Sequence, residues 1–292
     1  MTASRSYGDE IAVVIVTYSP GETLERNLDS IKAATTRQAQ VVLADNGSTD
    51  GIPERAAEAR PEVRFVPTGA NLGYGGAANR GAAELGDEVG WVVISNADVE
   101  WQPGALDELL AAADRWPRGG AFGPLINEPD GSVYPSARLL PSLGRGAGHA
   151  AFSRVWPDNP WTRAYRQSES GIRERKAGWL SGSCLLLRRE AFDSVDGFDP
   201  RYFMYFEDVD LGDRLGGKGW LNIYVPSARI THIGGHATSR NPGPMLTEHH
   251  RSAYRYLADR HRGAAWAPLR IGLRGALAAR ARLEVRAAER EN

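Results

Sequence analysis

The chain has 292 residues, 42% of them hydrophobic and 24% charged, with a formal net charge of −1. This composition is typical of a globular protein with a sizeable core, and the near-neutral charge argues against nucleic acid as a partner. The single cysteine, Cys184, excludes an internal disulfide framework and a metal site built from several cysteines. It lies in an apolar run, residues 184–187, so we expect a buried thiol and not a nucleophile.

The chain contains no apolar stretch approaching the roughly 20 residues that a membrane-spanning helix needs. Its first ten residues lack the apolar segment of a secretory signal, so we expect a cytoplasmic protein. Residues 251–292, however, carry ten arginines against four acids, and Ala, Leu and Val are interleaved among the arginines from 271 to 286. This pattern predicts a basic amphipathic helix, which suits peripheral contact with the inner face of the plasma membrane or with a partner. A solvated surface helix is the alternative.

Strand and helix signals alternate regularly over the first 126 residues. Short apolar runs predict strands, and apolar residues three or four apart predict helices. The expected strands cover residues 12–19, 40–44, 63–66, 89–95 and 121–126. The expected helices cover 22–34, a short segment after Pro53, 74–85, and 104–116, with Pro103 in the first helical position. The alternation predicts an α/β fold with a parallel sheet and right-handed crossovers.

After Pro129 the alternation ends. Residues 136–176 are rich in Gly, Pro, Arg and Trp, which predicts a long loop of the kind that is usually functional or mobile. The chain then returns to regular patterns. We expect a strand at 179–187, a short helix at 188–195, a helix beginning near Glu207, a last strand at 221–232, and tail helices at 254–261 and 269–288.

The fourth predicted strand ends in the polar segment Ser95-Asn96-Ala97-Asp98. In open α/β sheets, ligands bind beyond the carboxyl ends of the strands. Asp98 is therefore placed where a hard cation or a polar ligand would be met. A turn-forming Asp after a core strand is the alternative.

The second predicted strand ends in another polar segment, residues 45–50 (Asp-Asn-Gly-Ser-Thr-Asp). A carboxylate at this edge can accept a hydrogen bond from a base imide or a ribose hydroxyl, so we interpret Asp45 as a binding residue. Asp50 is better explained as a helix cap. The segment is not a calcium loop, because Ala56 occupies the place of the required glutamate.

Residues 73–78 match the pattern G-x-G-x-x-A of a dinucleotide-binding loop, and Asp98 follows at about the spacing of its ribose ligand. The context argues against that reading, because two strand–helix units precede the segment and a loop separates it from the third strand. We expect its small residues to let a helix approach the sheet or a ligand closely. Asn71 and Asn79 are available there as polar contacts.

Residues 202–206, aromatic except for Met204, stand immediately before the acids Glu207, Asp208 and Asp210. A partly desolvated wall raises the pKa of a carboxylate and suits a general base. The three acids fall within one helical turn and cannot all face the same way. We expect one to enter a site and another to cap the helix or to pair with Arg214. Simple complementation of the helix dipole is the alternative.

His232 ends the last predicted strand and is followed by Gly234 and Gly235, which permit close approach of the backbone. Together with Asp98, this placement makes His232 a candidate metal ligand. His236 is a further candidate. A structural histidine whose hydrogen bonds are satisfied is the alternative.

Taken together, these elements resemble inverting glycosyltransferases of family 2, which have the GT-A fold. The matching segments are 13–18 (Val-Val-Ile-Val-Thr-Tyr), 45–50, 71–73 (Asn-Leu-Gly), 96–98, 179–183 (Trp-Leu-Ser-Gly-Ser), Glu207-Asp208 and His232. Their order and spacing cover about residues 10–260. Within the family, the chain looks most like bacterial rhamnosyltransferases that decorate cell-wall or polysaccharide lipid intermediates.

The resemblance implies a Rossmann-like mixed sheet, mainly parallel and flanked by helices, with further helices at the C-terminus. It implies one GT-A domain over residues 10–245, composed of a nucleotide-binding half (10–126) and an acceptor and catalytic half (127–245). Residues 246–292 would form a basic helical extension.

The resemblance also implies roles for single residues. The nucleotide-sugar donor would be bound by Thr17, Tyr18, Asp45, Asn71, Asn79 and Asn96. Mg²⁺ or Mn²⁺ on the donor diphosphate would be held by Asp98 and His232, with Asn96 in place of the first acid of the usual D-x-D motif. The acceptor, a saccharide or a polyprenyl-diphosphate-linked saccharide, would be bordered by Trp179, Ser181 and Gly182. Asp208 matches the catalytic base, and Glu207 beside it would orient the acceptor or share that role.

The implied reaction is one displacement that inverts a sugar, with L-rhamnose from dTDP-rhamnose as the preferred donor. A divalent cation would neutralise the leaving charge, and a carboxylate would deprotonate the acceptor hydroxyl. An NAD-dependent dehydrogenase, a nucleotidyltransferase and a non-catalytic sugar-nucleotide-binding module are the alternatives. A nucleotidyltransferase should carry a basic, Gly-rich loop after the first strand, but no basic residue follows Tyr18 before Arg26. Intact acids at Asp98 and Asp208 argue against a degenerate binding module.

Overall fold

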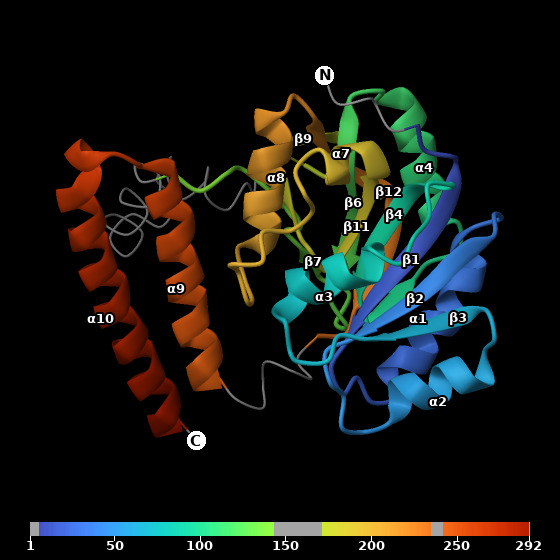
Figure 1. Ribbon diagram of the computed structural model, residues 1–292, viewed down its shortest axis with the longest axis horizontal. Helices are drawn as coiled ribbons and strands as arrows, with labels where there is room; N and C mark the ends of the chain where they lie inside the picture. Colours follow the sequence, from blue (N-terminus) through green and yellow to red (C-terminus); the bar gives the residue numbers. More distant parts are fainter. Residues whose placement is uncertain (1–5, 143–170, 235–241, 292) are drawn as a thin grey trace.

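The structure is a computed structural model that describes residues 6–142, 171–234 and 242–291, the last five by their backbone alone. A sheet of ten strands forms its centre, and helices cover both faces (Figure 1). The strands are β1 (Glu10–Thr17), β2 (Ala39–Asp45), β3 (Val63–Pro67), β4 (Val89–Asn96), β5 (Val99–Trp101), β6 (Gly119–Asn127), β7 (Val133–Tyr134), β8 (Ala137–Arg138), β9 (Arg175–Ala177), β10 (Trp179–Leu180), β11 (Cys184–Arg188) and β12 (Leu221–His232). The short strands β8 and β10 form a separate antiparallel pair.

The helices are α1 (Thr23–Ala34), α2 (Ile52–Ala59), α3 (Gly73–Ala82), α4 (Ala105–Arg115), α7 (Arg189–Asp193), α8 (Glu207–Gly217), α9 (Pro242–Arg260) and α10 (Ala267–Glu291), with a 3₁₀ turn η1 (Ala264–Trp266). Successive strand residues point to opposite faces of the sheet, so each central strand contributes side chains to two hydrophobic cores. One core joins the sheet to α1, α2 and α4, and the other joins it to α3, α7 and α8. The expected α/β layering is confirmed.

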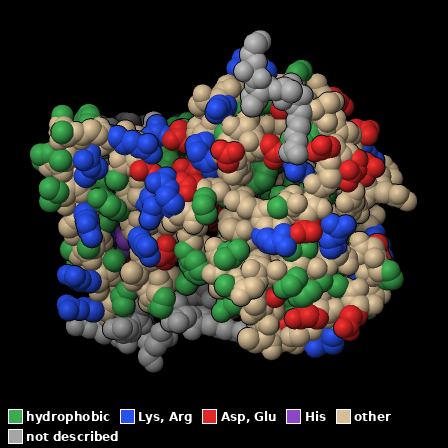
Figure 2. Space-filling model, viewed as in Figure 1, with side chains coloured by type: hydrophobic (Ala, Val, Ile, Leu, Met, Phe, Trp, Pro, Cys, Tyr) green, Lys and Arg blue, Asp and Glu red, His purple; other side chains and the backbone are tan. Residues whose placement is uncertain are grey.

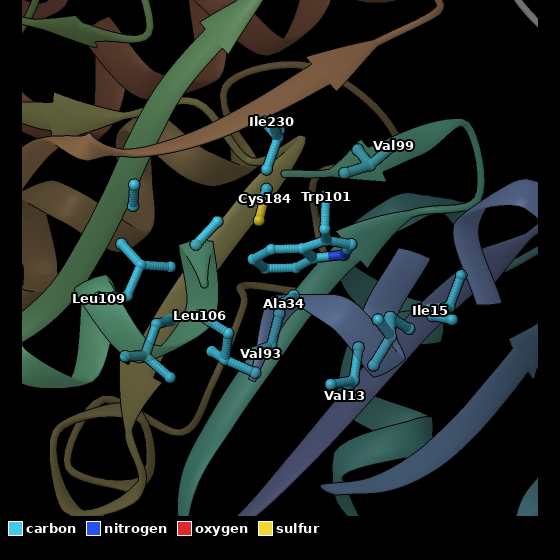
Figure 3. Packing of buried hydrophobic residues seen from close by; sticks show 14 of the residues in the cluster. Val13, Ile15, Ala34, Val93, Val99, Trp101, Leu106, Leu109, Cys184 and Ile230 are labelled. Atoms are coloured by element: carbon cyan, nitrogen blue, oxygen red, sulfur yellow. The ribbon is translucent and has the colours of Figure 1, made fainter. Parts of the chain in front are cut away.

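Figure 3 shows part of the first core, with Trp101 among Val93, Leu106 and Cys184. Cys184 has no exposed surface, and its burial raises the pKa of the thiol. A neutral buried thiol is a poor nucleophile, which confirms the expectation of a structural cysteine.

The main sheet has the strand order β3-β2-β1-β4-β11-β6-β12-β5. The first four strands are parallel, and β12 runs parallel to β6, but β11 is antiparallel to both of its neighbours. The alternation of the first 126 residues alone predicted a parallel sheet and missed this reversal. The reversal arises at β11, which enters the sheet between β4 and β6 only after the long segment that follows β6. The mixed, mainly parallel sheet implied by the family resemblance is confirmed.

Three details of the sequence reading are corrected by the structure. The strand β5 was not expected; it forms because the chain turns at Asp98 and pairs with the end of β12. Gly104 is the N-cap of α4, so Pro103 precedes the helix instead of opening it. The helix expected at 254–261 begins at Pro242. Its first turns hold His249 and His250 in place of an apolar stripe, and His250 is buried with its Nε2 atom 2.8 Å from Glu284 Oε2 of α10.

The two C-terminal helices form a hairpin that packs beside α8 (Figure 1). Tyr256 and Arg260 of α9 both bond Asp213 of α8. The helix α10 forms as predicted, but it is not amphipathic: Ala281 is buried, whereas Ile271 and Leu283 are 73% and 65% exposed on other sides. Among the described residues, no helix combines the length and apolar character needed to cross a bilayer. Most of the loop expected at 136–176 lies outside the described residues, as does His236.

Candidate active site

The carboxyl ends of β1 and β2 lie side by side, with Thr17 in register with Asp45. The Thr17 hydroxyl donates a 2.7 Å hydrogen bond to Oδ1 of Asp45, and both side chains are buried. The other carboxylate oxygen accepts the backbone N–H groups of Gly47 and Ser48 at 3.0 and 2.9 Å. Asp45 therefore fixes the loop at this edge. Tyr18 is 52% exposed directly beside it, so its ring is free to stack on a planar ligand.

Asn46 was not singled out from the sequence, yet it joins this loop to the start of α3. Its buried side chain accepts the N–H of Leu72 at 3.1 Å and donates to the carbonyl of Gly73 at 3.0 Å. Asn71 is exposed on the same turn, where its Oδ1 atom accepts the N–H of Gly73 at 3.0 Å. An Asn-Gly pair commonly marks only a turn, so the sequence offered little signal for this cross-link.

The glycines of α3 serve close packing. Gly73 has a φ of +76°, and a Cβ atom built there would lie 2.0 Å from the carbonyl oxygen of Phe203. A Cβ atom at Gly81 would lie 2.5 Å from Val14 of β1. The helix thus approaches both the sheet and the 198–203 loop closely, as expected from its small residues. Asn79, farther along α3, uses both ends of its amide on the backbone of Phe198, at 2.7 and 2.9 Å.

The ends of β4 and β12 bring Asp98 and His232 together. Oδ1 of Asp98 lies 3.1 Å from Nε2 of His232, and the amide nitrogen of Asn96 lies 3.1 Å from the same ring atom. The backbone N–H of Ile233 donates to the carbonyl of Asp98 at 2.9 Å, which holds the two segments in register. Residues distant in sequence thus form one polar cluster at the sheet edge.

Electrostatics couple Asp98 to His232. Burial opposes ionisation of Asp98, but the hydrogen bond and positive charge of His232 outweigh it and lower the pKa of Asp98. Burial likewise disfavours the charged form of His232, but the contact with Asp98 outweighs this and raises the pKa of the imidazole. Oδ1 of Asp98 and Nε2 of His232 both carry electron pairs and lie 3.1 Å apart, so a proton or a cation must lie between these two atoms.

A carboxylate oxygen is a suitable ligand for Mg²⁺ or Mn²⁺, and an imidazole nitrogen suits the transition metal Mn²⁺ better than Mg²⁺. Within the described part of the chain, no group of three or more His, Cys, Asp or Glu residues could hold a metal ion. Asp98 and His232 therefore fit a cation that takes its other ligands from phosphate oxygens and water, as Mg²⁺ commonly does.

The acids of α8 follow a strained backbone. Tyr205 and Phe206 have φ angles of +64° and +65°, which non-glycine residues rarely adopt and which cluster at functional sites. They turn the chain into the helix so that Asp208 meets Gly182. Oδ2 of Asp208 accepts the N–H of Gly182 at 2.9 Å, and Oδ1 accepts the N–H of Val209 at 2.8 Å.

Glu207 and Asp208 form a coupled pair with unequal exposure. Glu207 is buried, and within the described part of the chain its Oε2 atom has no hydrogen-bond partner. Burial, assisted by the charge of Asp208, raises the pKa of Glu207 to about 8. Burial also raises the pKa of Asp208, against the hydrogen bonds from Gly182 and Val209. Glu207 therefore retains a proton near neutral pH, whereas the more exposed Asp208 is the carboxylate available to accept one.

The third acid, Asp210, faces away from this pair. Its Oδ2 atom lies 2.6 Å from Nε of Arg214, one helical turn later. This confirms the expectation that one of the acids pairs with Arg214.

The segment from Trp179 to Ser183 connects the acids to the Asp98 cluster. The indole N–H of Trp179 donates to the carbonyl of Leu139 at 3.1 Å, and Ser181 lies 3.1 Å from Ser183, hydroxyl to hydroxyl. The carbonyl of Ser183 accepts the N–H of Asn96 at 2.9 Å. One continuous edge therefore runs from Asp208 through Gly182 to Asn96.

The sequence profile described as "Glycosyl transferase family 2" matches residues 12–196. The chain belongs to glycosyltransferase family 2. A relative from Mycobacterium tuberculosis (strain H37Rv), "N-acetylglucosaminyl-diphospho-decaprenol L-rhamnosyltransferase", is 58% identical and is matched over 97% of this chain and 95% of its own length. "O-antigen biosynthesis protein RfbC" from Myxococcus xanthus is 31% identical over 75% of this chain and 17% of its own length.

Solved structures show the same fold at 18% identity. GalNAc-T7 with UDP, GalNAc and Mn²⁺ has a TM-score of 0.59 and is matched over 83% of this chain and 47% of its own. The mannosyltransferase PcManGT from Pyrobaculum calidifontis, in complex with GDP-Man and Mn²⁺, has a TM-score of 0.58, with 94% and 71% matched. This family 2 glycosyltransferase has the GT-A fold, as the resemblance implied.

The structure of this family 2 enzyme places its sequence-predicted residues in two groups. Thr17, Tyr18, Asp45 and Asn71 lie at or near the ends of β1 to β3, and Asn96, Asp98, His232, Ser181, Gly182 and Asp208 share the edge beyond β4 and β12. Asn79 stands apart from both groups, bonded to the loop at Phe198. Their contacts with substrates stay predictions.

Proposed function

We propose that this glycosyltransferase moves L-rhamnose from dTDP-rhamnose to an N-acetylglucosaminyl-diphosphate-linked polyprenol in cell-wall synthesis, with inversion of the sugar. The observation that carries the proposal is 58% identity over nearly the full length of a relative named for this acceptor and this sugar. The paired acids beside the 179–183 segment supply the catalytic group that the reaction needs.

Asp208 takes the proton of the attacking acceptor hydroxyl. Its two oxygens are held by the N–H groups of Gly182 and Val209, so the carboxylate is oriented before the acceptor arrives. Glu207 keeps its own proton and, by doing so, avoids placing a second negative charge beside Asp208. An inverting displacement needs no covalent intermediate on the protein, because the hydroxyl attacks opposite to the departing nucleotide.

Asp98 and His232 would hold Mg²⁺ or Mn²⁺ at the diphosphate of the donor. The bound cation would supply neutralisation of the charge that develops on the leaving nucleoside diphosphate. Thr17, Tyr18 and Asp45 lie at the neighbouring strand ends, where the nucleoside is placed in this proposal. Burial of Thr17 and Asp45 leaves the exposed ring of Tyr18 and the backbone of the 45–48 loop as the contacting groups.

We also propose that the C-terminal hairpin, α9 with α10, contacts the surface of the membrane that carries the lipid acceptor. A groove of about 560 Å³ between the two helices is lined by arginines beside apolar side chains, including Arg251, Arg274, Arg282, Arg286, Leu277 and Val285. Figure 2 shows Lys and Arg side chains gathered over this part of the molecule. Such a surface combines attraction to anionic headgroups with apolar contact. The proposal places the enzyme on the cytoplasmic face.

The transfer is tested with dTDP-rhamnose, Mn²⁺ and an N-acetylglucosaminyl diphosphate carrying a short isoprenyl chain. NMR of the product reports the anomeric configuration, and we expect inversion. Asp208→Asn should lower kcat by at least about a hundredfold, the usual contribution of a general base, while dTDP still raises the melting temperature. Glu190→Gln, an equivalent change at an exposed acid of α7, is the control. Full activity of Asp208→Asn, or transfer only from other nucleotide sugars, would contradict the proposal.

A further inference from the structure

Arg138, at the end of β8, is a cation that the sequence reading did not single out. It is the cross-strand partner of Trp179 in the β8–β10 pair. Its guanidinium carbon lies 5.6 Å from the centre of the Trp179 ring and 5.4 Å from the centre of the Tyr134 ring. Two aromatic rings thus hold the planar group by cation–π contact.

These contacts hold the guanidinium in one orientation. Its Nε atom donates to the carbonyl of Pro135 at 2.8 Å, and within the described part of the chain the two Nη groups have no partner. Arg138 also forms no ion pair with Asp208, whose oxygens are occupied by Gly182 and Val209. An arginine fork held in this way matches a phosphate group bidentately and loses little conformational entropy when it binds one.

The position of Arg138 relative to Asp208 suits the proposed acceptor. The β10 strand leads directly from Trp179, beside Arg138, to Gly182, which touches Asp208. The positive charge of Arg138 also favours the ionised form of Asp208, although the larger effect of burial raises the pKa of that carboxyl. In an N-acetylglucosaminyl diphosphate, the attacking hydroxyl and the diphosphate are carried by different carbons of one sugar ring. Such an acceptor requires a base and an anion site along the same edge, and the β8–β10 pair connects Arg138 to the segment that holds Asp208.

We propose that Arg138, held between Tyr134 and Trp179, binds the diphosphate of the acceptor and makes the enzyme selective for diphosphate-linked sugars. This inference rests on the proposed function and names the group that recognises its acceptor. The donor phosphates are placed at the Asp98 edge in the proposed function, so the anion assigned to Arg138 is that of the acceptor.

Binding of two acceptors without donor tests the proposal: an N-acetylglucosaminyl diphosphate with a short isoprenyl chain, and a neutral N-acetylglucosaminide with the same chain. We expect the wild type to bind the diphosphate at least tenfold more tightly. Arg138→Ala should lose that preference, a tenfold to hundredfold change typical of hydrogen bonds to charged groups, and Arg138→Lys should lose part of it. Affinity for the neutral acceptor and for dTDP should not change.

Arg188→Ala is the matched control. Arg188 also stacks on a tryptophan, at 4.5 Å from the ring of Trp91, and also bonds a backbone carbonyl through Nε, but it lies at the opposite end of β11 from the site. It should keep the preference. Equal loss for both acceptors in Arg138→Ala, weaker dTDP binding, or no preference in the wild type would overturn the proposal. If the acceptors bind as expected but no rhamnose is transferred, the proposed donor is wrong and the role of Arg138 stands.

Discussion

The backbone N–H of Gly182 donates a 2.9 Å hydrogen bond to the carboxylate of Asp208, and a Cβ atom built on Gly182 would lie 3.2 Å from the Cβ of Asp208. The contact joins the acceptor edge to the first turn of α8. A larger residue at position 182 would push against Asp208. We therefore expect the activity to be sensitive to a single methyl group added at this position.

Gly182→Ala should lower kcat by roughly tenfold with little loss of stability. The added methyl group would lie 3.2 Å from the Cβ atom of Asp208 and must push it by a few tenths of an ångström, and small misplacements of catalytic groups have large effects. Gly216→Ala, on the helix that carries Asp208, is the control, because no atom lies within 4 Å of its added Cβ. Steady-state kinetics and thermal melts of both variants check this. Unchanged kcat in Gly182→Ala would mean that Asp208 tolerates displacement or is not the base.

Glu207 should make stability depend on pH in an unusual direction. Its pKa is about 8 in the folded protein and 4.5 ordinarily, so the folded state binds the proton more tightly. The stabilisation is fully present below pH 4.5 and is lost as the pH rises through 8. Glu207→Gln should remove the effect and be more stable than the wild type at pH 8.5, by on the order of a few kcal/mol. Urea unfolding of both proteins between pH 5 and 8.5 measures this. If the unfolding free energies of the two proteins differ by the same amount at every pH in this range, Glu207 is not buried as an acid.

Asn96→Asp should strengthen metal binding. The amide nitrogen of Asn96 lies 3.1 Å from the same His232 nitrogen that faces Asp98, so a carboxylate there would add a negatively charged oxygen to the cluster. We expect the Mn²⁺ affinity to rise about tenfold, equal to about 1.4 kcal/mol, and Asp98→Ala to abolish the stabilisation by Mn²⁺ with dTDP. Thermal shifts with and without dTDP provide the measurement, with Asp130→Asn as an exposed control. Equal Mn²⁺ responses in all of these proteins would place the cation elsewhere.

Arg282→Glu on α10 should weaken attachment to anionic vesicles by roughly tenfold, since each basic residue near such a surface contributes about 1 kcal/mol. Arg282 is exposed on the wall of the groove between α9 and α10. Lys218→Glu, at the exposed end of α8, makes the same charge change outside the hairpin. Cosedimentation at low and high salt should separate the two variants at low salt only. Equal loss of vesicle binding in both variants would show that only the net charge of the protein matters, and not the position of the arginine.

The sequence allowed prediction of features that depend on local pattern. Asp45, Asn96 and Asp98 were found from an apolar run followed by polar residues, and the parallel register of β1 with β2 places Thr17 beside Asp45. The contact of Asp98 with His232 lies where β12 pairs antiparallel with β5. What failed depended on distant pairing. The reversal of β11 and the short β5 depend on which neighbours the chain meets after its long excursion.

Arg138 is the clearest case among the candidate site residues. Nothing in its neighbourhood in the sequence distinguishes it from the other arginines of a chain rich in them. It acquires its orientation from Trp179, which lies 41 residues later and reaches it only through the register of β8 with β10. Asn46 was missed for the same reason, since its partners Leu72 and Gly73 belong to another loop.

The place of β11 between β4 and β6 has a consequence for how the molecule is assembled. During synthesis, β4 and β6 leave the ribosome well before the strand that separates them, and domains fold progressively as they emerge. The two strands cannot pair with each other without closing the gap that residues 184–188 must enter. The first half of the chain can therefore form β1 to β4 early, but the edge from Asp208 to Asn96 exists only after β11 has been inserted. A fragment that stops before this strand would leave β4, β5 and β6 with unpaired edges and would be expected to aggregate.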